Sequence, residues 1–72
     1  MKTNVQTPGQ RSVIGRTCLI RDKKHNDRAF FGARVIEADA EERCSRRVRL
    51  LTGEHAGEVL RRGEYDVLEF TD

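Results

Sequence analysis

The stretch that decides the fold is "VRLLTGEHAGEVLRRGEYDVLEF", residues 48–70, in which short apolar runs alternate with links that contain glycine. Gly53 and Gly57 lie in the first link, and two glycines between apolar runs usually supply the positive φ of a tight reversal. We therefore interpret residues 52–57 as a turn between two strands. Gly63 marks a second, shorter turn before the last strand. The core candidates of that strand are Val67, Leu68 and Phe70.

A phosphate-binding loop is the alternative interpretation of residues 52–57, and the sequence argues against it. Such a loop needs a Lys followed by Ser or Thr and then a helix, and neither is found here. Glu54 and Glu58 would also place negative charge where a phosphate would lie.

Two segments upstream show the alternation of apolar and polar residues that is typical of strands. In "VIGRTCLIRD", residues 13–22, one face carries Ile14, Cys18 and Ile20. In "AFFGARVIEAD", residues 29–39, one side carries Phe31, Ala33 and Val35, and the other carries Phe30, Arg34 and Ile36. Gly32 in the middle of the second segment predicts a bulge or a sharp bend.

Residues 36–51 allow two interpretations. A helix would align apolar residues that recur at helical spacing, namely Ile36, Ala40, Cys44, Val48 and Leu51. It would also place Asp39 near Arg43 at i,i+4. A strand over "CSRRVRLLTG" instead alternates Val48 and Leu50 with arginines, and a loop at "DAEER" gives an ordinary hairpin length. We predict strands, and a helix near residues 37–51 in an α+β fold is the alternative.

The predicted fold class is therefore all-β, a five-stranded small barrel. Residues 1–12 are polar, contain the only proline and show no periodicity, so we predict a disordered, flexible N-terminal tail. Residues 13–72 are predicted to form a single small β-barrel domain. A chain of 72 residues buries only about 60% of its unfolded surface, which leaves little material to line a substrate cavity. We predict that the protein is not an enzyme.

The order of strands and turns in residues 13–70 resembles the Src-homology-3-like small barrel. The segment "VRLLTGEHAGEVLRRGEYDVLEF" is similar to the Tudor and KOW types of that barrel, where a strand such as "VRL" precedes a turn, a short strand, a helical turn and a last strand. The resemblance implies a barrel that binds nucleic acid or protein. The sequence departs from the family because it has no Trp for a proline-rich peptide groove and no further glycine at Glu58 or Val59. The only aromatics are Phe30, Phe31, Tyr65 and Phe70, and most of these four are needed for the core rather than for a methyl-ligand cage.

Cysteine and histidine chemistry is not indicated by the sequence. Zinc sites usually draw their ligands as close pairs, and Cys18, Cys44, His25 and His55 form none. We therefore predict no metal, no cofactor and no catalytic residues. The two cysteines are expected to be buried, reduced thiols of a cytoplasmic protein, because the chain has no apolar run that could span a membrane and no secretory signal. We expect no membrane partner.

Arginine is the functional signal that remains. The formal net charge is only +2, yet acidic and basic residues occur in separate blocks, and most of the 14 basic residues are Arg. Guanidinium favours planar, bidentate contact with phosphate. The predicted nucleic-acid-binding residues are Arg34, Arg46, Arg47, Arg49, Arg61 and Arg62. The same pattern is also typical of an ordinary solvated face paired with acids.

Two functional hypotheses follow. The first is a non-enzymatic small-barrel module that contacts nucleic acid, RNA or DNA, through an arginine-rich face. The second is a protein-interaction or regulatory subunit, with a mobile element as one source, because exposed sheet edges suit pairing with another chain. The sequence does not define the oligomeric state or choose between RNA, DNA and protein.

Overall fold

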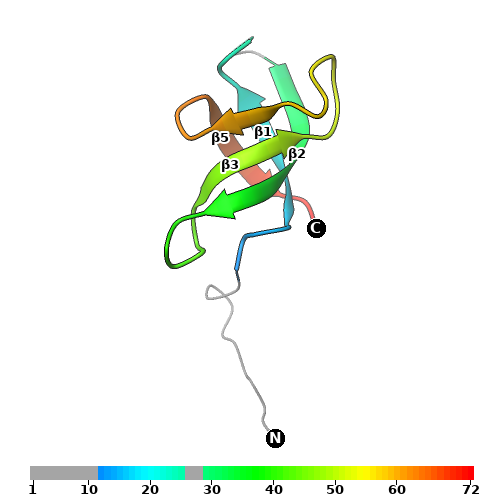
Figure 1. Cartoon of the computed structure of the whole chain (residues 1–72). Coiled ribbons are helices and arrows are strands. Elements are labelled where there is room, and N and C mark those ends of the chain that lie inside the picture. Colours follow the sequence, from blue (N-terminus) through cyan, green and yellow to red (C-terminus); the bar gives the residue numbers. More distant parts are fainter. Residues whose placement is uncertain (1–11, 26–28) are drawn as a thin grey trace, which may run out of the picture.

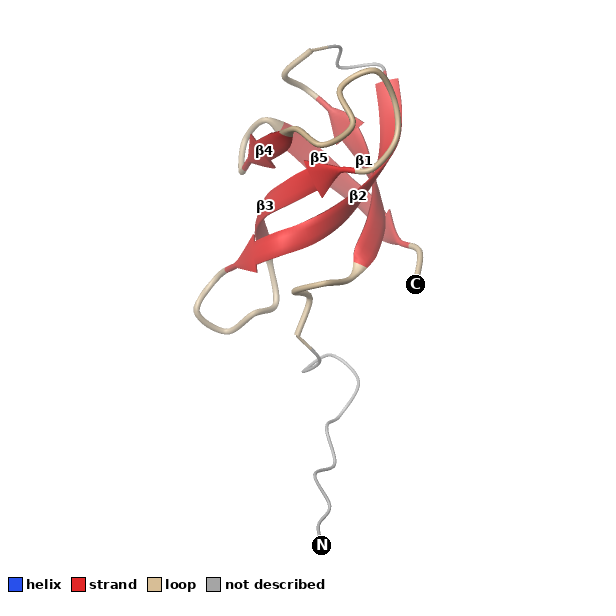
Figure 2. Cartoon of the chain, turned by 45° about the vertical axis from the view of Figure 1, so that its right-hand side comes forward, coloured by secondary structure: helices blue, strands red, loops and turns tan. Residues whose placement is uncertain are grey.

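The computed structural model describes residues 12–25 and 29–72 of the chain (Figure 1). Five strands form one antiparallel sheet: β1 Thr17–Asp22, β2 Ala29–Ala38, β3 Ser45–Leu50, β4 Val59–Arg61 and β5 Tyr65–Phe70. Figure 2 shows only strands and loops in the described residues, so the predicted five-stranded all-β class is confirmed. The tail predicted for residues 1–12 lies, apart from Ser12, outside the described residues.

The strand order in the sheet is β4-β3-β2-β1-β5. The sheet is strongly curved (Figure 1), but β4 and β5 are its two edges, and no pairing joins them within residues 12–25 and 29–72. Closure into a barrel therefore stays a prediction. No helix in the part of the chain that the structure describes is long and apolar enough to cross a membrane.

The core lies on the concave inner face of the sheet, where alternate residues of each strand point inward. The buried apolar residues are Val13, Cys18, Ile20, Ala33, Val35, Val48, Leu50, Leu60 and Tyr65, and Phe31, Ala38, Val67 and Phe70 pack partly buried against them. The sides predicted for β2 and β3 are thus confirmed. Full burial of one such aliphatic side chain stabilises the fold by about 1.5–3 kcal/mol, so this single layer carries most of the stability.

The helix considered for residues 37–51 is wrong, and the reason is the loop that follows β2. The Asp39 carboxylate oxygen Oδ1 accepts the backbone N–H groups of Arg43 at 2.8 Å and Cys44 at 3.2 Å. Asp39 therefore bonds the backbone of Arg43 rather than its guanidinium. Glu42 adopts a left-handed φ of 58°, which ends any helical path and returns the chain to β3.

The turn predicted for residues 52–57 is confirmed. Gly53 and Gly57 have φ values of 91° and 95°, in the region that favours glycine. The Gly57 N–H donates to the Leu50 carbonyl at 2.7 Å, which closes the link between β3 and β4. A Cβ atom at Gly53 would overlap the Phe31 ring, so this position needs glycine for close packing as well as for its φ.

Three details of the strand predictions are wrong, and two of them concern the positions of β-bulges. The bulge predicted at Gly32 is absent, because Gly32 pairs in regular register with Leu19 and the irregularities of β2 occur between Val35 and Ala38 instead. The sharp bend, the other option at Gly32, stays a prediction. In β5, Leu68 is 47% exposed because the register with β1 shifts between Leu19 and Ile20. Such a bulge turns one residue out of the alternation.

The third wrong detail concerns the start of the domain. Ile14 is 46% exposed because it lies in a turn before β1, where Gly15 has a φ of 87°. Val13 enters the core in its place, and its N–H donates to the Glu42 carbonyl at 2.9 Å. The sequence prediction applied the alternation of a strand to Ile14, which lies in a turn.

Candidate functional site

All six predicted arginines are exposed and lie on or next to the three neighbouring strands β2, β3 and β4. We call this set, Arg34, Arg46, Arg47, Arg49, Arg61 and Arg62, the arginine face. Val48 and Leu50 point into the core, so Arg47 and Arg49, which alternate with them, point away from it. Arg46 is also exposed, because the register between β2 and β3 shifts beside it.

Arginines of the arginine face lie opposite each other across strand pairs. Arg34 of β2 is the direct partner of Arg49 in β3, and Arg47 is the direct partner of Arg61 in β4. The N–H of Arg62 donates to the Arg46 carbonyl at 2.9 Å, which holds those two residues side by side as well. Directly opposed like charges destabilise a sheet. The fold therefore bears an electrostatic cost at this surface.

Few acids compensate that charge. Within the described residues, only Arg47 of the six makes an ion pair, through its Nε at 2.9 Å from Glu37 Oε1. Glu64 accepts a hydrogen bond from the backbone N–H of Arg61 at 2.8 Å. Glu37 and Glu64 line an open hollow of about 310 Å³ together with Arg46, Arg47, Arg61 and Arg62. The hollow is polar, shallow and rich in guanidinium groups.

The basic residues of β1 and its flanks are arranged differently. Arg21 and Lys23 both pair with Asp66, at 2.8 Å and 3.6 Å. Arg16 pairs with Asp72 at 3.1 Å, and its guanidinium carbon lies 4.2 Å from the centre of the Phe70 ring. The hydrogen bond from Arg21 holds the pKa of Asp66 below its ordinary value. Positive charge near β5 is therefore neutralised by the chain itself.

One aromatic ring lies on the outer side of β2. Phe30 is 57% exposed, whereas Phe31 and Phe70 pack against the core and Tyr65 is buried. Phe30 and Arg34 are an even number of residues apart in one strand and so lie on the same face. Four residues of strand separate them by about 13 Å.

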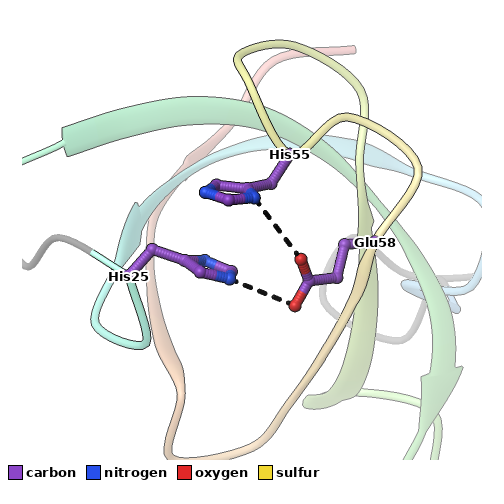
Figure 3. Close-up of side chains that lie close together, drawn as sticks. All are labelled: His25, His55 and Glu58. Atoms are coloured by element: carbon purple, nitrogen blue, oxygen red, sulfur yellow. Dashed lines mark ion pairs between the residues drawn. The ribbon is translucent and has the colours of Figure 1, made fainter.

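A second polar assembly forms where two loops meet, at one end of the sheet. Figure 3 shows His25, from the link after β1, next to His55 and Glu58, from the link between β3 and β4. The two imidazole rings are stacked, with centroids 3.8 Å apart and an interplanar angle of 12°. Glu58 Oε2 lies 3.2 Å from His25 Nε2, and Glu58 Oε1 lies 3.7 Å from His55 Nδ1.

Asp22, at the end of β1, holds His25 of this assembly through hydrogen bonds. Its side chain is fully buried, and Oδ1 accepts the backbone N–H groups of Lys24 at 2.8 Å and His25 at 3.0 Å. Its other oxygen, Oδ2, lies 2.9 Å from His25 Nδ1. Burial alone would raise the pKa of Asp22, but these hydrogen bonds outweigh it and lower the pKa below its ordinary value. Asp22 is therefore an ionised carboxylate. We call Asp22, His25, His55 and Glu58 the histidine cluster.

Lys24 adds a positive charge beside the histidine cluster. Its Nζ lies 2.9 Å from Glu58 Oε2, the same oxygen that faces His25. This contact raises the pKa of Lys24 and lowers the pKa of Glu58. Glu58 is thus surrounded by groups that favour its negative form.

Sequence reasoning missed the histidine cluster. His25 and His55 were considered as metal ligands and set aside because they are not a close pair in the sequence. Glu58 was seen only as a charge that argues against a phosphate loop. One signal could have found Asp22: it continues the inward-facing series of Cys18 and Ile20, and an acid in such a series needs partners.

The two cysteines differ from the prediction in part. Cys18 is a buried free thiol, and burial raises its pKa, which makes it a poor nucleophile. Cys44 is also free but exposed, because it lies in the loop before β3 rather than in the core.

Comparison with known proteins gave no match to a protein family, to a curated protein or to a solved structure. The Src-homology-3-like, Tudor and KOW resemblance therefore stays a prediction, and the function has to be argued from the arginine face and the histidine cluster.

Proposed function

We propose that the arginine face binds the phosphate backbone of nucleic acid, RNA or DNA, without reading its bases, and that the protein is a non-enzymatic binding module. The observation that carries the proposal is the direct opposition of Arg34 with Arg49 and of Arg47 with Arg61. A sheet that served only as a solvated surface would gain stability from opposite charges at these positions. A bound polyanion supplies the missing negative charges.

The contrast between strands supports this assignment. Arg16 and Arg21, on the β1 side, already pair with Asp72 and Asp66, so a phosphate there would have to displace a carboxylate. In the arginine face, among the ion pairs of residues 12–25 and 29–72, only Arg47 would have to leave its acid, Glu37. Phosphate contacts release counterions from the nucleic acid, which makes binding favourable at low salt and weaker as salt rises.

Phe30 adds a stacking surface about 13 Å along β2 from Arg34, directly across from Arg21 of β1. Its exposed ring lies on the face of β2 that carries Arg34. Proteins that bind single strands combine basic grooves with such aromatic platforms, and a stacked base contributes about 1–3 kcal/mol. The proposed ligand is therefore a single strand rather than a duplex.

Fluorescence anisotropy with a labelled single-stranded oligonucleotide, in a series of salt concentrations, tests the proposal. The double variant Arg47→Gln/Arg49→Gln should bind more weakly, and the slope of log affinity against log salt should fall by about one for each phosphate contact removed. Glu37→Gln should bind more tightly, because it frees Arg47. Phe30→Ala should weaken single-strand binding more than duplex binding.

Arg16→Gln/Lys23→Gln is the matched control, because it removes the same charge from two basic residues that the chain already neutralises. It should retain most of the affinity. Equal losses in both double variants would show that only net charge matters, and the proposal would be wrong. Absence of binding by the unaltered chain at low salt would also end it. A protein partner that is purified with the chain and stays after nuclease treatment would favour the interaction-subunit hypothesis instead.

A further inference from the structure

The geometry of the histidine cluster points to a binding site for one divalent transition-metal ion of the Zn²⁺ class, held by His25, His55 and Glu58. One ligand atom from each residue lies within 4.8 Å of the other two. The site is separate from the arginine face, and the inference does not depend on nucleic-acid binding.

The orientation of His25 is the first argument. Asp22 Oδ1 already accepts two backbone N–H groups, so its carboxylate acts as an acceptor here, and His25 Nδ1, 2.9 Å from Asp22 Oδ2, donates to it. In the neutral ring, Nε2 then presents its lone pair to Glu58. Histidines that bind metals usually donate their other ring N–H to a carboxylate in this way, which fixes the tautomer of the ring.

The contact between His25 and Glu58 is the second argument. His25 Nε2 lies 3.2 Å from Glu58 Oε2. At that distance the ring nitrogen and the carboxylate oxygen converge on one point, where a proton on the ring or a divalent cation can lie between them. Two ligands of a tetrahedral Zn²⁺, each at about 2.0–2.1 Å, lie about 3.3 Å apart, which matches this separation.

His55 supplies the third ligand after a small movement. Its Nδ1 lies 3.7 Å from Glu58 Oε1, the second oxygen of the same carboxylate. Because the rings of His25 and His55 are parallel, an ion in the plane of one ring is outside the plane of the other. The His55 ring must therefore rotate about its side-chain bonds, and its 36% exposure leaves room for that.

Charge and ligand type select the ion. Two imidazole nitrogens and a carboxylate are ligands that Zn²⁺ and its neighbours bind well, whereas Ca²⁺ and Mg²⁺ prefer oxygen. The charges of Glu58 and Asp22 balance one divalent ion. Lys24 Nζ lies 2.9 Å from Glu58 Oε2, where the metal ion would bind. The Lys24 side chain would therefore have to move away from Glu58 when the ion binds. Three protein ligands leave one position for water.

The test is calorimetric titration of Zn²⁺ into the full chain after treatment with a chelator, with the unfolding temperature measured in parallel. We expect one Zn²⁺ per chain and a rise in the unfolding temperature, because the ion would join two loops and bind only the folded form. His55→Ala and Glu58→Gln, on a surface loop, should each lower the Zn²⁺ affinity by at least about 10–100-fold. Even a change in a residue that only orients a metal ligand causes a loss of that size.

Lys24→Ala sharpens the test, because removal of the competing ammonium should raise the Zn²⁺ affinity severalfold. Cys44→Ser is the matched control: it removes an exposed metal-binding group outside the histidine cluster and should leave the affinity unchanged. The inference is overturned if the unaltered chain gives neither heat nor a temperature shift. It is equally overturned if folded His55→Ala, checked by circular dichroism, binds Zn²⁺ as tightly as the unaltered chain, or if Cys44→Ser abolishes binding.

Discussion

The arginine face and the histidine cluster use charge in opposite ways. Arg34 and Arg47 lie opposite other arginines, and within the described residues only Arg47 of the arginine face makes an ion pair. In the histidine cluster, Asp22 accepts backbone N–H groups and lies against His25, and Glu58 lies beside Lys24 and His25. Polar groups that satisfy one another stabilise the fold, whereas groups left without partners lower its stability and gain most from a ligand. The comparison therefore separates a surface on which like charges oppose one another from a cluster whose acids are bonded within the chain.

Their positions in the fold also differ. Four members of the arginine face, Arg34, Arg47, Arg49 and Arg61, occupy paired strand positions, so their spacing is fixed by the sheet. The histidine cluster joins the link after β1 to the link between β3 and β4, which lie at the same end of the molecule in Figure 1. Asp22 fixes one of these links by bonding two of its backbone N–H groups. We therefore expect changes in the cluster to affect stability most.

The largest effect is expected from Asp22→Ala. The change leaves the N–H groups of Lys24 and His25 and the ring nitrogen of His25 without their acceptor. Hydrogen bonds to a charged group are worth about 1.5–3 kcal/mol each in net terms, so the free energy of unfolding should fall by at least about 2–3 kcal/mol. Urea denaturation followed by circular dichroism measures the change.

Asp66→Ala is the control for that prediction, because it removes an exposed carboxylate from ordinary surface ion pairs. Its effect should be much smaller, since exposed pairs contribute little. If Asp22→Ala lowers the free energy of unfolding no more than Asp66→Ala does, buried Asp22 does not stabilise the link after β1. The contrast between the histidine cluster and the exposed surface would then be wrong.

The strands and the arginine face could be predicted because both follow a local period. Val48 and Leu50 alternate with Arg47 and Arg49, and a period of two places them on opposite faces whatever the rest of the chain does. The apolar composition of the last strand misplaced Leu68, because a bulge is a property of two paired strands and not of one.

The histidine cluster could not be predicted in this way, because its members meet through tertiary structure. His25 lies in a link without periodicity, and Glu58 lies after a turn whose path depends on Gly53 packing against Phe31. No spacing in the sequence brings these side chains together. Helix-spaced apolar residues around Asp39 were equally misleading, since the Asp39 side chain bonds the loop backbone instead.

The second prediction is a loss of stability in acid that depends on Asp22. Its pKa in the folded chain lies below the ordinary value of 3.8, so the unfolded chain takes up the proton more readily. The stabilisation is complete above that value and is lost as the pH falls through the lower pKa of the folded form. Urea midpoints measured from neutral pH downward should fall more steeply for the unaltered chain than for Asp22→Asn, which has no charge to lose. Parallel curves for the two chains would contradict the prediction.

The smallest effects are expected from two substitutions to Thr, which should change the free energy of unfolding in opposite directions. They test the comparison most directly. Arg49→Thr removes a charge that opposes Arg34, so it should raise the free energy of unfolding by about 0.2–1 kcal/mol. Arg21→Thr removes a charge that pairs with Asp66 and should lower it slightly. The intrinsic preference of Thr for strands acts in both variants and largely cancels between them.

Salt provides the internal control of that pair of variants. Both effects are electrostatic and exposed to solvent, so raising the ionic strength should bring the two unfolding midpoints together. A difference that persists at high salt would mean that side-chain packing, and not charge, separates the two positions. Shifts of the same sign at low salt would mean that Arg49 is already compensated in solution, and the arginine face would then have no excess charge to offer a nucleic acid.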